Sequence, residues 1–262
     1  MNNLAKSKKR GGEKGEPLLF LTASVNVGGA LHVSDELQQT EVRIQQYLQA
    51  IRIQLENTTF RILLVENTGY DFSKHFTAEI ASGRMEVLTF YGNERAGDLG
   101  RGYGEMVILK YGFEHSQFVK ECNTVIKVTG RHVVHNTQQL YRLIKLFRHK
   151  RDFVAANLQG YTHWATSDLF VASKSFYENH LFPLTPQLKD WVYNYENALY
   201  DAMCSSARAG FQTIQLPYCI KQSGSWGGNG NDLSKMILSS HRFGVKCFIV
   251  SVLNELHLRK IF

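Results

Sequence analysis

The chain has 262 residues, 44% of them apolar, which is enough for one large α/β domain or two small ones. The chain has no run of 18 or more apolar residues, so we expect no membrane-spanning helix. The formal charge is +7, and about +4 remains once the basic residues 1–16 are set aside. This mild excess suits an anionic substrate, a membrane surface or nucleic acid, and does not choose among them.

The two ends of the chain differ from its middle. Residues 1–16 are basic and glycine-rich and lack the apolar segment of a secretory signal, so we expect a disordered tail. Residues 233–262 join an apolar stretch to basic side chains, which predicts an amphipathic helical segment that packs on the domain or lies on an anionic membrane. The four cysteines form no CxxC pair, so a reducing, cytoplasmic setting fits best.

Strand and helix patterns alternate between these ends. Residues 60–69 are a nearly continuous apolar run, which is typical of a parallel strand buried on both faces. The alternation favours an α/β fold with a mostly parallel central sheet flanked by helices. Strands are predicted at 17–25, 60–69, 85–90, 124–129 and 152–157, and helices at 35–56, 105–116, 137–149 and 191–203.

Residues 92–105 form a glycine-rich loop ahead of a predicted helix. Free backbone N–H groups and the helix dipole at such a place favour phosphate, and Arg101 can add bidentate contacts. The spacing matches neither the P-loop nor the dinucleotide-binding fingerprint, so a flexible surface loop is the alternative.

A second candidate is Thr129-Gly130-Arg131, at the carboxyl end of the strand 124–129. Ligands of open α/β sheets bind at this edge, and Arg131 there suits a diphosphate or a carboxylated sugar. The alternative is an arginine that closes a turn by pairing with a nearby acid.

Carboxylates supply the third candidate. Glu196 lies among Trp191, Tyr193 and Tyr195, and apolar company of this kind raises a carboxyl pKa toward that of a general base. A helix glutamate facing solvent is the alternative. Asp168 and Asp98 are single acids that can orient a hydroxyl or bind a metal.

The histidines follow no metal-ligand spacing, and His132 beside Arg131 is expected to be structural or exposed. The basic run 142–151 is expected to be a solvated helix face. Tyr141 and Phe147 fall on opposed faces of that helix, which argues against a stacking platform for RNA.

Together these stretches resemble a group of nucleotide-sugar glycosyltransferases from bacterial capsule and O-antigen loci. That group carries a strand ending in Glu-Asn-Ser/Thr-Gly, a G-K/R-G-Y-G-E loop, and a K-x-T-G-R-Y/H segment followed shortly by Asn. The likeness covers roughly residues 17–230. The matching residues are Glu66-Asn67-Thr68-Gly69, Gly100-Arg101-Gly102-Tyr103-Gly104-Glu105, and Lys127-Val128-Thr129-Gly130-Arg131-His132 with Asn136.

The resemblance implies a GT-A-like single domain at 17–232, with a nucleotide-binding half at about 17–135 and an acceptor half at about 136–232. Ordinary GT-A enzymes hold a divalent metal with a DxD motif at the end of a central strand, and this chain has no acid in that place. We therefore expect transfer without a metal, Mg²⁺ or Mn²⁺ being the alternative. A CMP-sugar suits a metal-free site, with a UDP- or GDP-sugar as the other option.

The resemblance also implies roles for single residues. Glu196 is the expected general base of an inverting transfer, with Asp168 as second choice, and no metal ligands are expected. Acceptor-binding residues are expected at Trp164, Trp191 and Tyr195. Donor-binding residues are expected at Thr22, Ala23, Ser24, Glu66, Asn67, Arg101, Gly102, Tyr103, Gly104, Glu105, Lys127, Thr129, Gly130 and Arg131.

The predicted function is sugar transfer from a nucleotide-sugar donor to a hydroxyl of a surface glycan or a lipid-linked glycan, such as capsule, O-antigen or lipopolysaccharide. The predicted location is the cytoplasm, with the inner face of the cell membrane as a further partner. A basic nucleic-acid-binding domain and a non-catalytic scaffold domain are the rival interpretations, and nucleic acid is not the expected partner.

Overall fold

The computed structural model describes residues 16–27, 40–159, 162–216 and 220–223. The predicted tail at 1–16, apart from Glu16, and the predicted segment at 233–262 lie outside the described residues. Within the described residues, no helix combines the length and the apolar character that crossing a bilayer requires.

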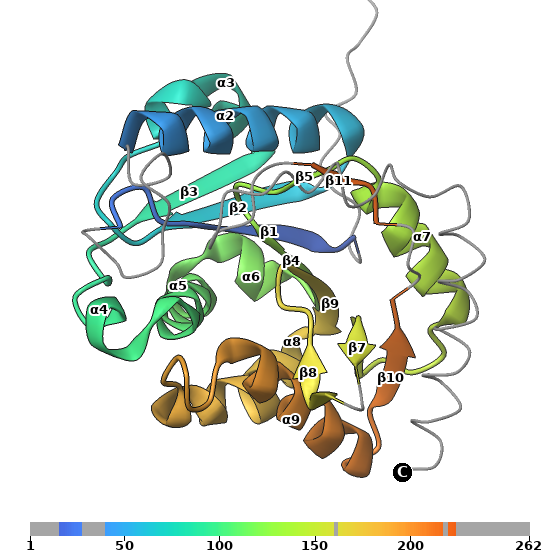
Figure 1. Ribbon diagram of the computed structural model, residues 1–262. Coiled ribbons are helices and arrows are strands. Elements are labelled where there is room, and N and C mark those ends of the chain that lie inside the picture. The colour runs from blue at the N-terminus through green and yellow to red at the C-terminus, as the bar shows by residue number, and fades with distance from the viewer. Residues whose placement is uncertain (1–15, 28–39, 160–161, 217–219, 224–262) are drawn as a thin grey trace, which may run out of the picture.

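A seven-stranded sheet forms the centre of the molecule, in the order β10-β6-β9-β4-β1-β2-β3 (Figure 1). Pairing is parallel except at β9, which runs antiparallel to both β4 and β6. The prediction of a mostly parallel sheet is confirmed. The strands are β1 Leu18–Ala23, β2 Arg61–Glu66, β3 Met85–Thr89, β4 Thr124–Thr129, β6 Phe153–Ala156, β9 Leu169–Ser173 and β10 Gln212–Gln215.

Helices cover both faces of this sheet, because its central strands are apolar on both sides. Along β1, Leu18 and Phe20 belong to one hydrophobic cluster, whereas Leu19 and Leu21 belong to the other. Helices α2 and α7 pack on the second cluster, and α5, α6 and α9 pack on the first (Figure 1). The α-helices are α2 Thr40–Asn57, α3 Thr77–Ala81, α4 Ala96–Leu99, α5 Arg101–His115, α6 Gln117–Glu121, α7 Thr137–Phe147, α8 Lys174–Phe176 and α9 Tyr195–Arg208.

Shorter elements complete the described chain. A 3₁₀ turn η1 (Ser73–His75) precedes α3, and a π-helical turn η3 (Tyr177–Leu181) followed by a 3₁₀ turn η4 (Phe182–Gln187) continues from α8. Two small antiparallel pairs border the main sheet: β5 (Val133–Val134) with β11 (Gln222–Ser223), and β7 (Leu158–Gln159) with β8 (Trp164–Ala165).

The glycine-rich stretch 92–105 is not a flexible loop, so that alternative is wrong. It contains the short helix α4, and α5 begins at Arg101, four residues before the predicted start. Between the two helices Gly100 has φ 97°, a conformation that glycine adopts without strain.

Two further expectations needed correction. The helix predicted at 191–203 begins only at Tyr195, because residues 189–193 form a turn closed by a bridge between Lys189 and Tyr193. Strands β9 and β10 were not predicted. Strand β9 lies between β4 and β6 in the sheet, and its antiparallel direction carries the residues that precede it to the carboxyl edge of β4.

The tight packing between α5 and the sheet predicts opposite outcomes for two glycine-to-alanine substitutions. A Cβ at Gly112 would lie 2.4 Å from the buried ring of Phe20, whereas a Cβ at Gly97 in α4 would meet nothing within 4 Å. We expect Gly112→Ala to lower the free energy of unfolding by about 1–3 kcal/mol. Gly97→Ala, the matched control, should leave it unchanged or raise it by up to about 1 kcal/mol.

Urea denaturation of both variants measures this difference. A Gly112→Ala protein as stable as the wild type would show that α5 does not pack this closely on β1.

Candidate functional site

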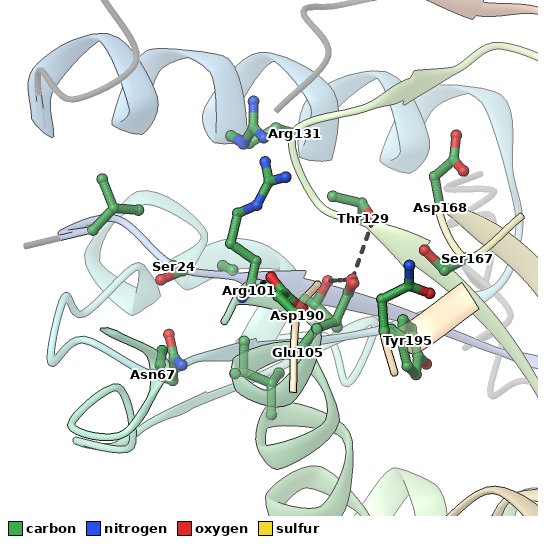
Figure 2. A pocket seen from close by; sticks show the side chains of 18 of the residues that line it. Ser24, Asn67, Arg101, Glu105, Thr129, Arg131, Ser167, Asp168, Asp190 and Tyr195 are labelled. Carbon is green, nitrogen blue, oxygen red and sulfur yellow. Dashed lines mark hydrogen bonds between the residues drawn. The ribbon is translucent and has the colours of Figure 1, made fainter. Parts of the chain in front are cut away.

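A cavity of about 480 Å³ lies at the carboxyl ends of β1 and β4, beside the first turns of α5 and α9 (Figure 2). It brings together most of the residues predicted to form the site, from the donor, catalytic and acceptor groups alike. The predicted residues that line it are Thr22, Ala23, Ser24, Asn67, Arg101, Gly102, Gly104, Glu105, Thr129, Arg131, Trp164, Asp168, Trp191, Tyr195 and Glu196.

A buried ion pair lies under the centre of this cavity. The Lys127 side chain is completely buried, and its Nζ lies 2.5 Å from Glu105 Oε1 and donates to the Ser167 carbonyl oxygen at 2.6 Å. Glu105 Oε1 also accepts hydrogen bonds from the hydroxyls of Thr22 and Thr129 (Figure 2). One carboxylate and one ammonium therefore connect the ends of β1 and β4 to the first turn of α5.

Glu196 extends this network toward α9. Its Oε1 accepts a hydrogen bond of 2.8 Å from the hydroxyl of Ser167, the residue whose carbonyl accepts from Lys127. Burial raises the pKa of the Glu196 carboxyl above its ordinary value, although the Ser167 hydrogen bond acts in the opposite direction. The predicted rise in this pKa is confirmed.

Asp168 takes part in a separate set of contacts. Gln222 Nε2 donates to Asp168 Oδ2 at 3.1 Å and lies 2.8 Å from His132 Nδ1. Burial lowers the pKa of His132 to about 4, so its ring is neutral at physiological pH. With Nδ1 facing an amide donor, the proton of the neutral ring is on Nε2, which has no hydrogen-bond partner among the described residues.

Three arginines approach the cavity from different elements. Arg131 follows β4, Arg101 begins α5, and Arg43 comes from α2. Figure 2 shows the Arg101 side chain pointing toward Arg131. Arg43 is 5% exposed and donates to the Ser24 carbonyl, and burial, with a smaller contribution from Arg131, lowers its pKa. The lining of the cavity therefore contains three guanidinium groups.

The glycines before α5 accommodate a carboxylate of the same chain. Asp190 Oδ2 accepts a hydrogen bond of 2.8 Å from the Arg101 backbone N–H, at the N-terminus of α5 (Figure 2). A Cβ at Gly100 would lie 2.0 Å from Asp190 Cγ, and one at Gly102 would lie 2.9 Å from Tyr195 Cβ. The first free N–H of this helix is thus engaged by Asp190, although the sequence pattern pointed to phosphate.

Four residues of the predicted donor set do not line the cavity. Glu66 is buried and accepts hydrogen bonds from the backbone N–H groups of residues 25, 68 and 70, so it organises the ends of β1 and β2. Lys127 lies beneath the surface. Gly130 allows its backbone to approach Thr22, whose carbonyl oxygen would lie 2.6 Å from an added Cβ, and Tyr103 packs beside Arg95.

The predicted acceptor residues lie in different environments. Trp191 is 82% exposed at the rim, and Trp164 is partly buried in the wall. Tyr195 is 1% exposed, with its ring 5.6 Å from Lys127 Nζ, so it supports the floor of the cavity. At the other end, Asn67 is 1% exposed and its Oδ1 has no partner in the described part of the chain.

No family model matches the chain, and no curated protein matches it. Among solved structures, it resembles the bifunctional glycosyltransferase WbbM, with 10% identity over 79% of this chain and 39% of that one and a TM-score of 0.49. It also resembles the mannosyltransferase PcManGT of Pyrobaculum calidifontis, in complex with GDP-Man and Mn²⁺ (9% identity, 77% and 54% coverage, TM-score 0.46).

A cytidylyltransferase of Leptospira borgpetersenii is a third similar structure, with 13% identity over 79% of this chain and 77% of that one and a TM-score of 0.41. These similarities extend across more than one reaction class and all have TM-scores below 0.5. The chemistry of the site therefore has to be argued from the chain's own side chains.

The donor atoms at the cavity do not match those that a divalent metal ion prefers. Thr129, Gly130 and Arg131 offer no carboxylate at the end of β4, and the neighbouring Glu105 is paired with Lys127. No group of three or more His, Cys, Asp or Glu side chains in the described ranges is placed to hold a metal. These residues suit an anion better than a divalent cation.

Sequence reasoning missed four residues at or beside this cavity, because none of them carries a motif: Arg43, Ser167, Asp190 and Gln222. His132 belongs to the quoted motif and was expected to be structural or exposed; it is buried on the cavity wall. A charged residue on the buried face of the helix 40–57 was the available signal for Arg43, because such a charge needs a partner.

The buried, neutral His132 predicts a pH dependence of stability. Its pKa falls from 6.5 to about 4 in the folded chain, so between these values the unfolded chain binds a proton that the folded chain does not. The free energy of unfolding should therefore fall as the pH drops from 6.5 toward 4, by up to about 1.4 kcal/mol per pH unit from this group. His132→Gln should show a shallower decline, measured by urea denaturation at a series of pH values. Identical slopes would mean that His132 is not kept neutral by folding.

Proposed function

We propose that this chain transfers a sugar from a nucleotide-sugar donor to a hydroxyl group of a glycan or lipid-linked glycan acceptor. The observation that carries the proposal is the division of one cavity between three guanidinium groups and a carboxylate of raised pKa, Glu196. The GT-A-like arrangement, the order of the motifs along the chain and the position of the cavity at the carboxyl edge of the sheet support it.

In the proposed reaction, Glu196 accepts the proton of the acceptor hydroxyl while that oxygen attacks the anomeric carbon of the donor. The bond between the anomeric carbon and the phosphate oxygen breaks, and the electron pair leaves with the nucleotide. A single displacement of this kind inverts the anomeric centre. The raised pKa of Glu196 makes its carboxylate a stronger base than that of an exposed glutamate, and Ser167 orients this carboxylate.

The leaving nucleotide carries negative charge that has to be stabilised. Arg131, Arg101 and Arg43 lie where they can do so, and guanidinium groups bind phosphate oxygens in a bidentate manner. We infer that they take the part that a metal ion plays in metal-dependent transferases. Asn67 and Ser24, at the far end of the cavity, are the proposed contacts for the nucleoside. The proposal of a surface glycan as acceptor rests on the motif resemblance, and the proposal of a place at the inner face of the cell membrane rests on the basic, amphipathic pattern of residues 233–262.

Substitution of the proposed base is the first test. Glu196→Gln should lower the turnover of nucleotide sugar by about 10²-fold or more. Asp168→Asn, the matched control, should have a much smaller effect, measured as release of nucleotide in the presence of acceptor. Turnover of Glu196→Gln within a few-fold of wild type would contradict the assignment, and loss only in Asp168→Asn would transfer the role to Asp168.

The stability of Glu196→Gln shows whether a loss of turnover comes from misfolding. A carboxyl whose folded pKa is raised favours folding at pH values below its ordinary pKa of 4.5 and disfavours folding once the pH passes the folded pKa. Glu196→Gln should therefore be at least as stable as wild type at pH 7 in urea denaturation.

The proposal that transfer needs no metal ion is tested separately. A panel of CMP, UDP and GDP should contain one nucleotide that raises the melting temperature in EDTA. Arg131→Met should abolish that rise, whereas Arg142→Ala on the exposed face of α7 should not. A rise that needs added Mn²⁺ would overturn the metal-free assignment, and no rise with any nucleotide would overturn the donor assignment.

A further inference from the structure

A second cleft, of about 540 Å³, lies along α9 and the turns η3 and η4. It is distinct from the candidate active site, yet the same two segments line both. In the hairpin β7–β8, His163 lines the second cleft and the next residue, Trp164, lines the first. In α9, Glu196 lines the first cavity, and Tyr200 and Arg208 line the second.

One carboxylate joins the two sites. Asp201 Oδ1 lies 2.9 Å from His163 Nε2, and Asp201 Oδ2 accepts a hydrogen bond of 2.7 Å from the Tyr193 hydroxyl. His163 immediately precedes Trp164, and Tyr193 follows Trp191 by two positions. Asp201 thus contacts both segments that carry a tryptophan of the active-site cavity, the one with Trp164 and the one with Trp191.

Backbone strain occurs in these same two segments. Among the described residues, only His163 (φ 51°) and Trp191 (φ 74°) are non-glycine residues with positive φ. Such conformations cost on the order of 1–3 kcal/mol and persist where the surroundings hold them for function. Here the His163 carbonyl accepts from Asn197 Nδ2 at 2.8 Å, and its ring lies over Tyr200 with centroids 4.3 Å apart.

The chemistry of the second cleft suits a polyhydroxylated, uncharged ligand. The aromatic rings of His163 and Tyr200 line it, together with the Asp201 carboxylate and the side chains of Asn179 and Arg208, which can donate hydrogen bonds. A carboxylate in the lining disfavours phosphate and nucleic acid, which would otherwise match the basic composition of the chain. From Glu196 to Arg208, α9 rises about 18 Å, which leaves room for several linked sugar units.

We propose that this cleft binds further sugar units of an oligosaccharide acceptor whose terminal unit lies in the active-site cavity. The inference rests on the proposed function for the identity of its ligand. It makes the chain selective for acceptors of more than one sugar, because binding energy gained beside α9 adds to that gained near Trp164 and Trp191.

The test measures binding of linear bacterial-type oligosaccharides of increasing length on a glycan array, with dissociation constants from biolayer interferometry. His163→Gly keeps the positive φ without strain and removes the ring, so the variant should fold. We expect His163→Gly and Arg208→Ala to weaken binding of the longer oligosaccharides by about tenfold each. Lys145→Ala, an exposed position on α7, serves as the control and should bind as wild type does.

The nucleotide-induced rise in melting temperature, recorded on the same proteins, separates the two proposals. Suppose that the nucleotide raises the melting temperature normally, but both substitutions leave oligosaccharide binding unchanged or no oligosaccharide binds at all. This result overturns the cleft proposal and leaves the proposed function standing. Variant-sensitive binding without any nucleotide effect overturns the proposed function and keeps the cleft as a glycan site.

Discussion

The site depends on a charged ammonium group that has no access to solvent. Lys127 lies inside the sheet, and a charge in that place is tolerated only when it is paired and hydrogen-bonded. Its partners come from the first turn of α5, from the end of β4 and from the segment before β9. The need to pair one buried cation therefore fixes the relative positions of three segments. Glu196 is positioned by the same arrangement, because it accepts a hydrogen bond from the Ser167 hydroxyl.

The direction of β9 explains how acidic and basic groups come to share one cavity. Parallel strands β1 and β4 deliver Thr22, Thr129 and Arg131 at their carboxyl ends. Because β9 runs the opposite way, the residues that enter it reach the same edge and bring Ser167 and Asp168. Guanidinium groups from the first half of the chain and the carboxylates of Asp168, Asp190 and Glu196 from the second half thus line one cavity, in which Glu105 is neutralised by the buried Lys127.

Local patterns were enough to predict five of the seven strands of the sheet, because those strands are apolar runs, and they indicated the strand ends at which the cavity lies. They were not enough for contacts made across long separations. The glycines before α5 suggested an anion cradle, and an anion does lie there, but it is Asp190, 89 positions away along the chain. Glycine patterns show that something approaches the backbone closely and do not identify it. Strand β9 was missed because its five residues continue directly into α8, so no loop separates the two elements.

Two hydrogen bonds hold the turn at 189–193 against the rest of the chain. Asp190 accepts one from the Arg101 backbone N–H, and the Tyr193 hydroxyl donates the other to Asp201. Its outward side chains, Trp191 and Val192, are 82% and 77% exposed. Residues that maintain the turn and residues that meet the outside are therefore different residues. Substitution of the two exposed side chains would leave the anchoring hydrogen bonds intact, so under the proposed function related chains can change their acceptor at this turn without losing its shape.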